Sequence, residues 1–227
     1  MTDTVYCDCY VGQILNGKYH GQGKLTFSNG SCYNGQFACG KLCGQGTMEY
    51  CDGSVYVGGW RNNQQHGFGT LTIHGEYCYQ GFFDSGTFCG CGTMVWANGD
   101  IYQGHWCNGV RCGKGVFIKS DGAIYIGTWN NNKMDGQGLY VFSTGGFYQG
   151  EFCQGMFCGQ GVRVWSNNDV YFGQFHQDMR NGFGIFIDKY GIYQGYWQSH
   201  KMHGQGTLTT QAGSVNTGIW HYGTFVG

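Results

Sequence analysis

Large apolar residues alternate with small or polar ones in two kinds of short run along the chain. In the first kind, bulky residues stand four positions apart around a glycine, as at Tyr33, Gly35 and Phe37. A second run follows soon after, in which bulky residues such as Met48 and Tyr50 are separated by one residue. Alternation with a period of two is typical of a β-strand with one covered face. Each pair of runs therefore predicts two antiparallel strands.

Turn dipeptides separate the second run from the next first run. They include Asn29-Gly30, Asp52-Gly53, Asn98-Gly99 and Asp121-Gly122. Such dipeptides accept the positive φ values of a tight hairpin. We therefore expect a hairpin turn between each unit and the next.

The first run recurs at a nearly constant interval. The spacing is 23 residues throughout, except for 22 between Tyr171 and Tyr193. The units begin at Tyr10, Tyr33, Tyr56, Tyr79, Tyr102, Tyr125, Tyr148, Tyr171, Tyr193 and Asn216. We number this residue position 0; glycine recurs at positions 2, 11 and 13, and a ring is common at position 4. The period predicts a single array over residues 1–227 whose tenth unit, ending at Gly227, is incomplete.

The unit reads Y-x-G-x-W-x6-G-x-G and closely resembles the MORN (membrane occupation and recognition nexus) repeat. The resemblance covers the chain after its first few residues. The positions that carry it most clearly are Tyr33, Gly35, Tyr56, Gly58, Trp60, Tyr102, Gly104, Trp106, Tyr125, Gly127, Trp129, Tyr193, Gly195 and Trp197. The resemblance implies a MORN-only protein without an appended catalytic domain.

The predicted fold is all-β: an elongated single-layer antiparallel β-solenoid of successive hairpins. Strands stack at about 4.8 Å, so each unit adds about 9.6 Å and ten units span on the order of 95 Å. We interpret the glycines at positions 2, 11 and 13 as space for the aromatic ring of a neighbouring unit. Most rings are then core residues, although regularly spaced rings can also line a groove for a partner.

Both ends of the predicted array look uncapped. The first unit carries Ile14 where others have a ring, and the tenth unit begins at Asn216 and lacks a second strand in this interpretation. An open final strand offers unpaired backbone groups and favours self-association through the terminal repeats. A fragment boundary is the alternative explanation.

The composition narrows the class of protein further. The chain has 45 Gly, no Pro and 18% aromatic residues, which resembles neither collagen nor a disordered segment. Its formal net charge of −1 gives no global field for nucleic acid, and we expect no nucleic-acid partner. Met1–Tyr10 shows no export signal, so we expect a soluble, cytoplasmic protein associated with the cytoskeleton, with its 13 cysteines reduced.

No sequence feature predicts catalysis or a cofactor. The repeated GxG lacks the third glycine and the helix of a dinucleotide site, and Gly109–Lys114 is one residue short of a phosphate loop. The acidic residues are scattered through turns, with no recurring pair that could flank a scissile bond. We expect a protein that is not an enzyme and binds no cofactor.

Cysteine and histidine recur at position 10 of many units. Equivalent residues in adjacent units should lie about 9.6 Å apart, too far for two ligands of one zinc ion. We therefore expect no metal and interpret the row as a packing position. One denser cluster keeps a zinc hypothesis open against that of structural thiols: Cys89, Cys91, Cys107 and Cys112.

Three functions remain open at this point. The first is a structural scaffold that joins cytoskeletal or axonemal proteins, as the resemblance to MORN-only proteins implies. The second is a peripheral adaptor for acidic phospholipid head groups, which the family resemblance also suggests but which the sparse basic residues do not favour. The third is a cysteine-based zinc or redox sensor, which metal content and thiol accessibility would distinguish.

Overall fold

The structure is a computed structural model that describes residues 8–227. All regular elements in this range are β-strands, so the predicted all-β class is confirmed. Among these residues no helical segment has the length and apolarity that a membrane span would need. The chain divides into two compact units, Met1–Val110 and Arg111–Gly227, which are described separately below.

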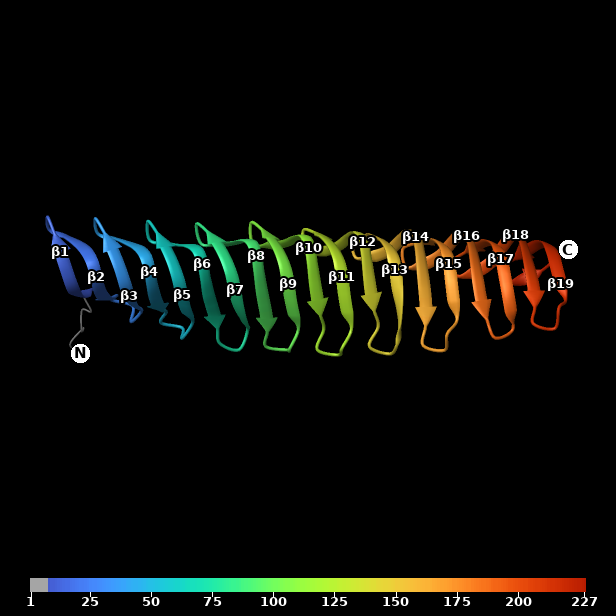
Figure 1. Cartoon of the computed structure of the whole chain (residues 1–227), viewed down its shortest axis with the longest axis horizontal. Coiled ribbons are helices and arrows are strands. Elements are labelled where there is room, and N and C mark those ends of the chain that lie inside the picture. Colours follow the sequence, from blue (N-terminus) through green and yellow to red (C-terminus); the bar gives the residue numbers. More distant parts are fainter. Residues whose placement is uncertain (1–7) are drawn as a thin grey trace, which may run out of the picture. The chain divides into compact units, whose positions relative to one another are not determined.

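The first unit contains nine strands. They are β1 (Cys9–Leu15), β2 (Lys18–Thr26), β3 (Cys32–Ala38), β4 (Lys41–Glu49), β5 (Val55–Arg61), β6 (Gln64–Ile73), β7 (Tyr77–Asp84), β8 (Thr87–Trp96) and β9 (Ile101–Cys107). Each strand pairs antiparallel with the next one in the chain. Figure 1 shows these strands side by side in chain order, from blue to green. The unit is one sheet of successive hairpins, as the two runs of each repeat predict.

The second unit continues the pattern with strands β10 to β20. They are β10 (Val110–Ile118), β11 (Ile124–Asn130), β12 (Lys133–Val141), β13 (Gly146–Cys153), β14 (Met156–Trp165), β15 (Val170–His176), β16 (Met179–Asp188), β17 (Gly191–Gln198), β18 (Lys201–Thr210), β19 (Val215–His221) and β20 (Thr224–Phe225). These strands also pair antiparallel in sequence order. The slip to 22 residues before Tyr193 is absorbed without breaking the pairing of β16 with β17.

The strand register aligns the glycines of positions 2 and 13 across the sheet. Gly35 lies opposite Gly46 in its own repeat, and Gly46 lies opposite Gly58 of the next repeat. A Cβ on Gly35 would stand 2.5 Å from the Tyr33 hydroxyl and 2.6 Å from the Cα of Gly46. The expectation that these glycines receive a neighbouring unit's ring is therefore wrong, because the ring of the same repeat covers both of them. The tyrosine lies back over its own hairpin.

The glycine at position 11 has a different role from the other two. Between Gly35 and Gln36 the partner on β4 jumps from Gly46 to Cys43, which leaves a bulge at Gly44 and Gln45. Gly44 has φ of 59°, a left-handed conformation that glycine adopts without strain. The residue is thus required by the backbone of the bulge and not by ring packing.

The tightest turns lie inside the repeats and not between them. At positions 6 and 7 both residues have positive φ, as at Asn62 (49°) and Asn63 (69°), which is the pattern of a two-residue hairpin turn. In the Asn29-Gly30 turn only Gly30 has positive φ, and its N–H donates to the carbonyl of Phe27 at 2.9 Å. The predicted hairpins are present, but the tight two-residue turns lie inside the repeats, at dipeptides such as Asn16-Gly17 and Asn108-Gly109, which the sequence analysis did not use.

The tenth unit is more complete than the sequence indicates. Strand β20 pairs with β19, and beyond it the Ile219 N–H donates to the Gly227 carbonyl at 2.8 Å. The Val226 N–H donates in turn to the Ile219 carbonyl at 2.9 Å. The prediction that the tenth unit lacks a second strand is wrong, because β20 pairs with the end of β19 at Trp220 and His221.

Candidate interaction surface

The tyrosine at position 0 anchors each repeat. Tyr56 is fully buried, and its hydroxyl donates to the carbonyl of Gly59 at 2.9 Å, inside the same repeat. Burial raises the pKa of Tyr33, Tyr56 and Tyr125 to about 12. These hydroxyls therefore stay protonated and hold the backbone next to the bulge.

The ring at position 4 joins one repeat to the preceding one. Trp60 meets the rings of Tyr56 at 5.2 Å and Tyr33 at 5.3 Å, both edge to face. Its indole N–H donates to the carbonyl of Gly46 at 3.2 Å, also in the preceding repeat. Edge-to-face pairs of this kind add stability beyond the area they bury.

The ring positions that define the repeat in the sequence all belong to the core. Their exposed fractions do not exceed 6% for Tyr33, Tyr56, Trp60, Tyr102, Trp106, Tyr125, Trp129, Tyr193 and Trp197. Gly35, Gly58, Gly127 and Gly195 lie under the rings of their own repeats, and Gly104 pairs with Gly92 in the same glycine row. A partner must therefore contact other residues.

Positions 9, 15 and 17 of the second strand lie on the same face of the sheet as these rings. We call the surface formed by positions 9, 15 and 17 the ring face. In the first unit Leu42 at position 9 and Met48 and Met94 at position 15 are buried. In the second unit the equivalent residues are half-buried, and three of them are arginines: Arg111 and Arg180 at position 9 and Arg163 at position 15. The sequence shows this signal as a positive charge at two positions that are uncharged in the other repeats.

Each of these arginines lies against aromatic rings. The guanidinium carbon of Arg163 stands 3.6 Å from the ring centroid of Phe142 and 5.2 Å from that of Trp165. That of Arg180 stands 4.2 Å from Trp197 and 4.8 Å from Phe186. A cation over an aromatic face is attracted by the ring, more strongly where water is excluded. Arg111 stacks in the same way on Trp129 at 4.4 Å.

The positive charges of Arg163 and Arg180 are not neutralised by contact with a carboxylate. Within residues 8–227 neither of these two arginines forms an ion pair with a carboxylate, in contrast to Lys119, which pairs with Asp121. Burial lowers the pKa of both guanidiniums, but an arginine side chain is not deprotonated in proteins. Both side chains are therefore charged and partly desolvated.

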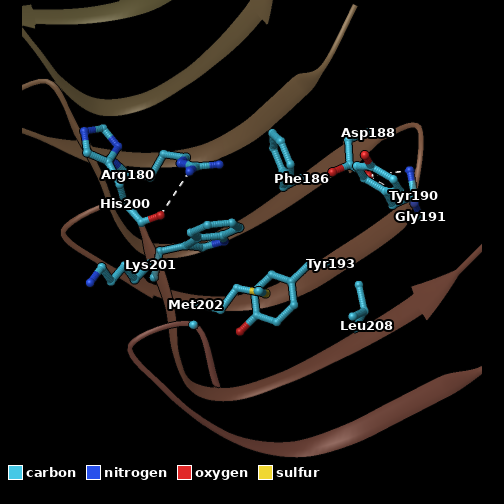
Figure 2. A pocket seen from close by; sticks show the side chains of 12 residues that line it. Arg180, Phe186, Asp188, Tyr190, Gly191, Tyr193, His200, Lys201, Met202 and Leu208 are labelled. Atoms are coloured by element: carbon cyan, nitrogen blue, oxygen red, sulfur yellow. Dashed lines mark hydrogen bonds between the residues drawn. The ribbon is translucent and has the colours of Figure 1, made fainter. Parts of the chain in front are cut away.

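A pocket of about 390 Å³ opens beside Arg180 on the ring face. Its apolar lining is Phe186, Tyr193, Trp197, Met202 and Leu208. Figure 2 shows Arg180, His200 and Lys201 on one side of this pocket and Tyr193 and Leu208 on the other.

The turn at position 7 of the ninth repeat fixes one wall of this pocket. The Nδ1 of His200 accepts the N–H of Arg180 at 3.3 Å, and an Arg180 Nη donates to the His200 carbonyl at 3.0 Å. Asn63 fills the same position in the third repeat, where its Oδ1 accepts the N–H of Leu42 at 2.8 Å. Burial, with the charge of Arg180, lowers the pKa of His200, which keeps the ring neutral and able to accept.

The four cysteines of the zinc hypothesis are not four free thiols. Cys107 and Cys112 are disulfide-bonded, whereas Cys91 Sγ lies 3.6 Å from the Nε2 of His105. Burial, and then the charge of Asp84, raises the pKa of the Cys89 thiol, which opposes the thiolate form that zinc requires. Within residues 8–227 no group of three or more His, Cys, Asp or Glu is arranged to hold a metal ion.

The prediction that the cysteines are reduced is wrong at a second place. Cys153 and Cys158 form a disulfide across the hairpin of β13 and β14. They occupy positions 5 and 10 of one repeat, on either side of its tight turn, and their Cα atoms are 5.9 Å apart. That separation falls in the range a disulfide spans. The count of cysteines gave no information on which pairs the hairpins bring together.

Comparison with known families identifies the class of protein. The MORN repeat family model matches nine consecutive segments, residues 10–32, 33–55, 56–73, 79–101, 102–124, 125–147, 148–170, 171–189 and 193–215. The chain therefore belongs to the MORN repeat family, as its sequence pattern indicates. The tenth unit, from Asn216, lies outside the matched segments. No curated protein sequence matches the chain significantly.

Solved structures with a similar strand arrangement include two complexes. One is the TCP10 domain of Danio rerio CPAP with a peptide of STIL, at 11% identity, a TM-score of 0.48, and coverage of 93% of this chain and 99% of that one. The other is the SAS-4 (dCPAP) TCP domain of Drosophila melanogaster with a proline-rich motif of Ana2, at 10% identity, a TM-score of 0.32, and coverage of 97% and 94%. Likenesses this distant transfer neither a ligand nor a partner to this chain.

Proposed function

We propose that this chain is a non-enzymatic scaffold that binds other proteins through the ring face of its repeats and organises cytoskeletal or axonemal assemblies. The observation that carries the proposal is the pair Arg163 and Arg180, two charged side chains held half-buried on aromatic rings without a carboxylate partner. The equivalent residues Met48 and Leu42 show that the fold itself accepts apolar side chains there. Arginine and aromatic residues are the side chains most enriched at the centres of protein interfaces.

The non-enzymatic part of the proposal is supported by the roles of the repeated polar groups. The hydroxyls of Tyr125 and Tyr148 donate to backbone carbonyls of their own repeats, both at 2.9 Å. Burial raises the pKa of both tyrosines, which makes their hydroxyls poor proton donors at neutral pH. The recurrent chemistry of the chain is thus used to hold its hairpins.

Detergent fractionation of the source cell tests this function. We expect the tagged full chain to remain with the detergent-insoluble cytoskeleton, and the double variant Arg163→Met, Arg180→Met to move into the soluble fraction. Methionine retains an unbranched apolar stem, and Arg61→Met is the matched control because Arg61 is exposed at the end of β5. If Arg61→Met moves into the soluble fraction as much as the double variant does, Arg163 and Arg180 do not support the scaffold function.

The alternative function, an adaptor for acidic phospholipid head groups, is favoured by a different set of residues. Lys18, Lys41, Lys133 and Lys201 begin the second strands of four repeats and are all exposed. Basic residues near a bilayer contribute about 1 kcal/mol each to binding of anionic lipid. If the chain instead floats with vesicles that contain phosphoinositides, and detergent releases it from the cell, the adaptor replaces the scaffold.

A further inference from the structure

Arg163 and Arg180 both lie close to one indole ring. The guanidinium carbon of Arg163 is 5.2 Å from the Trp165 ring centroid, and that of Arg180 is 5.8 Å from it. Phe186 meets the same indole edge to face at 5.9 Å. These four residues, Arg163, Trp165, Arg180 and Phe186, form what we call the arginine surface. Two fixed positive charges are therefore presented together on a rigid aromatic support.

Part of the hydrogen-bonding capacity of these guanidiniums is unused. An Nη of Arg163 donates to the carbonyl of Val164 at 2.6 Å, and an Nη of Arg180 donates to that of His200 at 3.0 Å. The Nε of Arg180 is buried and has no hydrogen-bond partner. A guanidinium carries five donors, so both groups retain donors for a further acceptor.

The nearest carboxylates are engaged elsewhere. Asp188 lines the pocket, but its Oδ1 accepts the N–H groups of Tyr190 at 2.7 Å and Gly191 at 3.0 Å. Asp169 shares a cavity of about 410 Å³ with Arg180 and Trp165, and the side-chain amide of Asn167 donates to it at 2.9 Å. Both carboxylates hold turns and neither forms an ion pair with the arginines; Asp169 attracts Arg180 through space only, so no carboxylate of residues 8–227 contacts the arginine surface.

The apolar pocket begins where the arginine surface ends. Arg180 and Phe186 belong to both, and the pocket continues to Met202 and Leu208. A ligand that reaches the guanidiniums can therefore place an apolar group in the pocket at the same time. In an extended peptide, side chains two positions apart point to the same side, about 7 Å from each other.

We propose that the arginine surface and its adjoining pocket bind an acidic peptide segment of a partner protein, in which an Asp or Glu stands two positions from a large apolar residue. The carboxylate accepts hydrogen bonds from Arg180, Arg163 or both, and the apolar side chain enters the pocket. This inference rests on the proposed scaffold function and names the chemistry of its partner. Planar guanidinium groups match carboxylates in a bidentate geometry.

A peptide fits this surface better than a bilayer does. The two guanidiniums are half-buried between rings, whereas contact with a flat membrane needs basic side chains that project from the surface. Of the four exposed lysines that could contact a membrane, only Lys201 lines this pocket. The half-buried charges and the apolar pocket together fit one acidic and one apolar side chain of an extended peptide that lies along the sheet.

Selection from a random displayed peptide library on the immobilised full chain tests the inference. We expect the retained peptides to share an acidic residue two positions from Leu, Ile, Met or Phe. Changing that acidic residue to its amide should weaken binding on the order of tenfold to a hundredfold, the usual range for a hydrogen-bonded charge. This change leaves the protein intact, so no folding defect can imitate the result.

Variants of the chain provide the second arm. Arg163→Met with Arg180→Met should give the same loss as the peptide amide, Arg180→Lys a smaller one, and Arg61→Met none. Retained peptides without an acidic residue, or binding unchanged in the double variant, would overturn the inference and leave protein binding by another surface intact. Failure to retain any peptide, together with binding to phosphatidylcholine vesicles that contain phosphatidylinositol bisphosphate, would overturn both the inference and the scaffold function.

Discussion

Replacing Gly138 by alanine places a methyl group where the ring of Tyr125 lies. The new Cβ would stand 2.6 Å from Cε2, 2.7 Å from the hydroxyl oxygen and 2.8 Å from Cζ of that ring. Non-bonded carbons attract one another best at about 3.5–4.0 Å, so the ring must move by roughly 1 Å. It is held edge to face between Trp129 at 5.2 Å and Phe152 at 4.9 Å, which leaves it little room.

We expect Gly138→Ala to lower the free energy of unfolding by about 3 kcal/mol, the upper end of the usual range for overpacking. Gly122→Ala is the control. The φ of Gly122 is 91° and a Cβ there meets nothing within 4 Å, so backbone strain alone should lower the free energy of unfolding, by about 1 kcal/mol. Denaturant titration of the full chain, followed by circular dichroism, measures both, provided that the slope of the transition is unchanged.

A double-mutant cycle shows which ring is responsible. In a Tyr125→Ala background the methyl group of Gly138→Ala no longer meets the ring, so its cost should fall below about 1 kcal/mol. If the effects of the two substitutions add within about 0.5 kcal/mol, the ring of the same repeat does not occupy this glycine, and our account of the hairpin core is refuted.

Two further predictions concern the second unit. His200→Asn should keep the acceptor for the Arg180 N–H and remove a pH dependence of stability. Burial and the charge of Arg180 lower the pKa of folded His200, so the free energy of unfolding of the wild type is highest above about pH 6.5 and falls as the pH drops below that value. Denaturant titrations above and below about pH 6.5 should show a smaller fall for the variant than for the wild type. Alkylation of the denatured, unreduced chain should leave Cys153 and Cys158 unmodified, with a disulfide-linked peptide in the digest; two alkylated residues would contradict the bond.

The sequence predicted the strands and their hairpin order because the period of the repeat records both. Spacing alone could not say whose ring covers a glycine, since Tyr33 and Tyr56 occupy the same phase. The folded backbone decides this: next to the bulge at Gly44, Gly35 lies opposite Gly46, and the ring of Tyr33 covers both. The resemblance to MORN repeats supplied the family, and the family match confirms it.

The candidate surface was missed for a related reason. Positions 9 and 15 tolerate many side chains, so Arg163 and Arg180 look like ordinary variation along the chain. Only the register of β14 with β15, and of β15 with β16, brings them to one indole. The disulfide between Cys153 and Cys158 escaped notice because pairing depends on which residues face each other across a turn.

Site-specific photo-crosslinking in the source cell tests the central claim, that partner proteins bind the ring face. One photoreactive residue replaces Tyr190, which lines the pocket and is 70% exposed. The other replaces Phe172, which follows the buried Tyr171 on the opposite face of β15 and is 47% exposed. We predict protein adducts from position 190 and none from position 172. Adducts from position 172 alone, or adducts with lipid alone, would contradict the account.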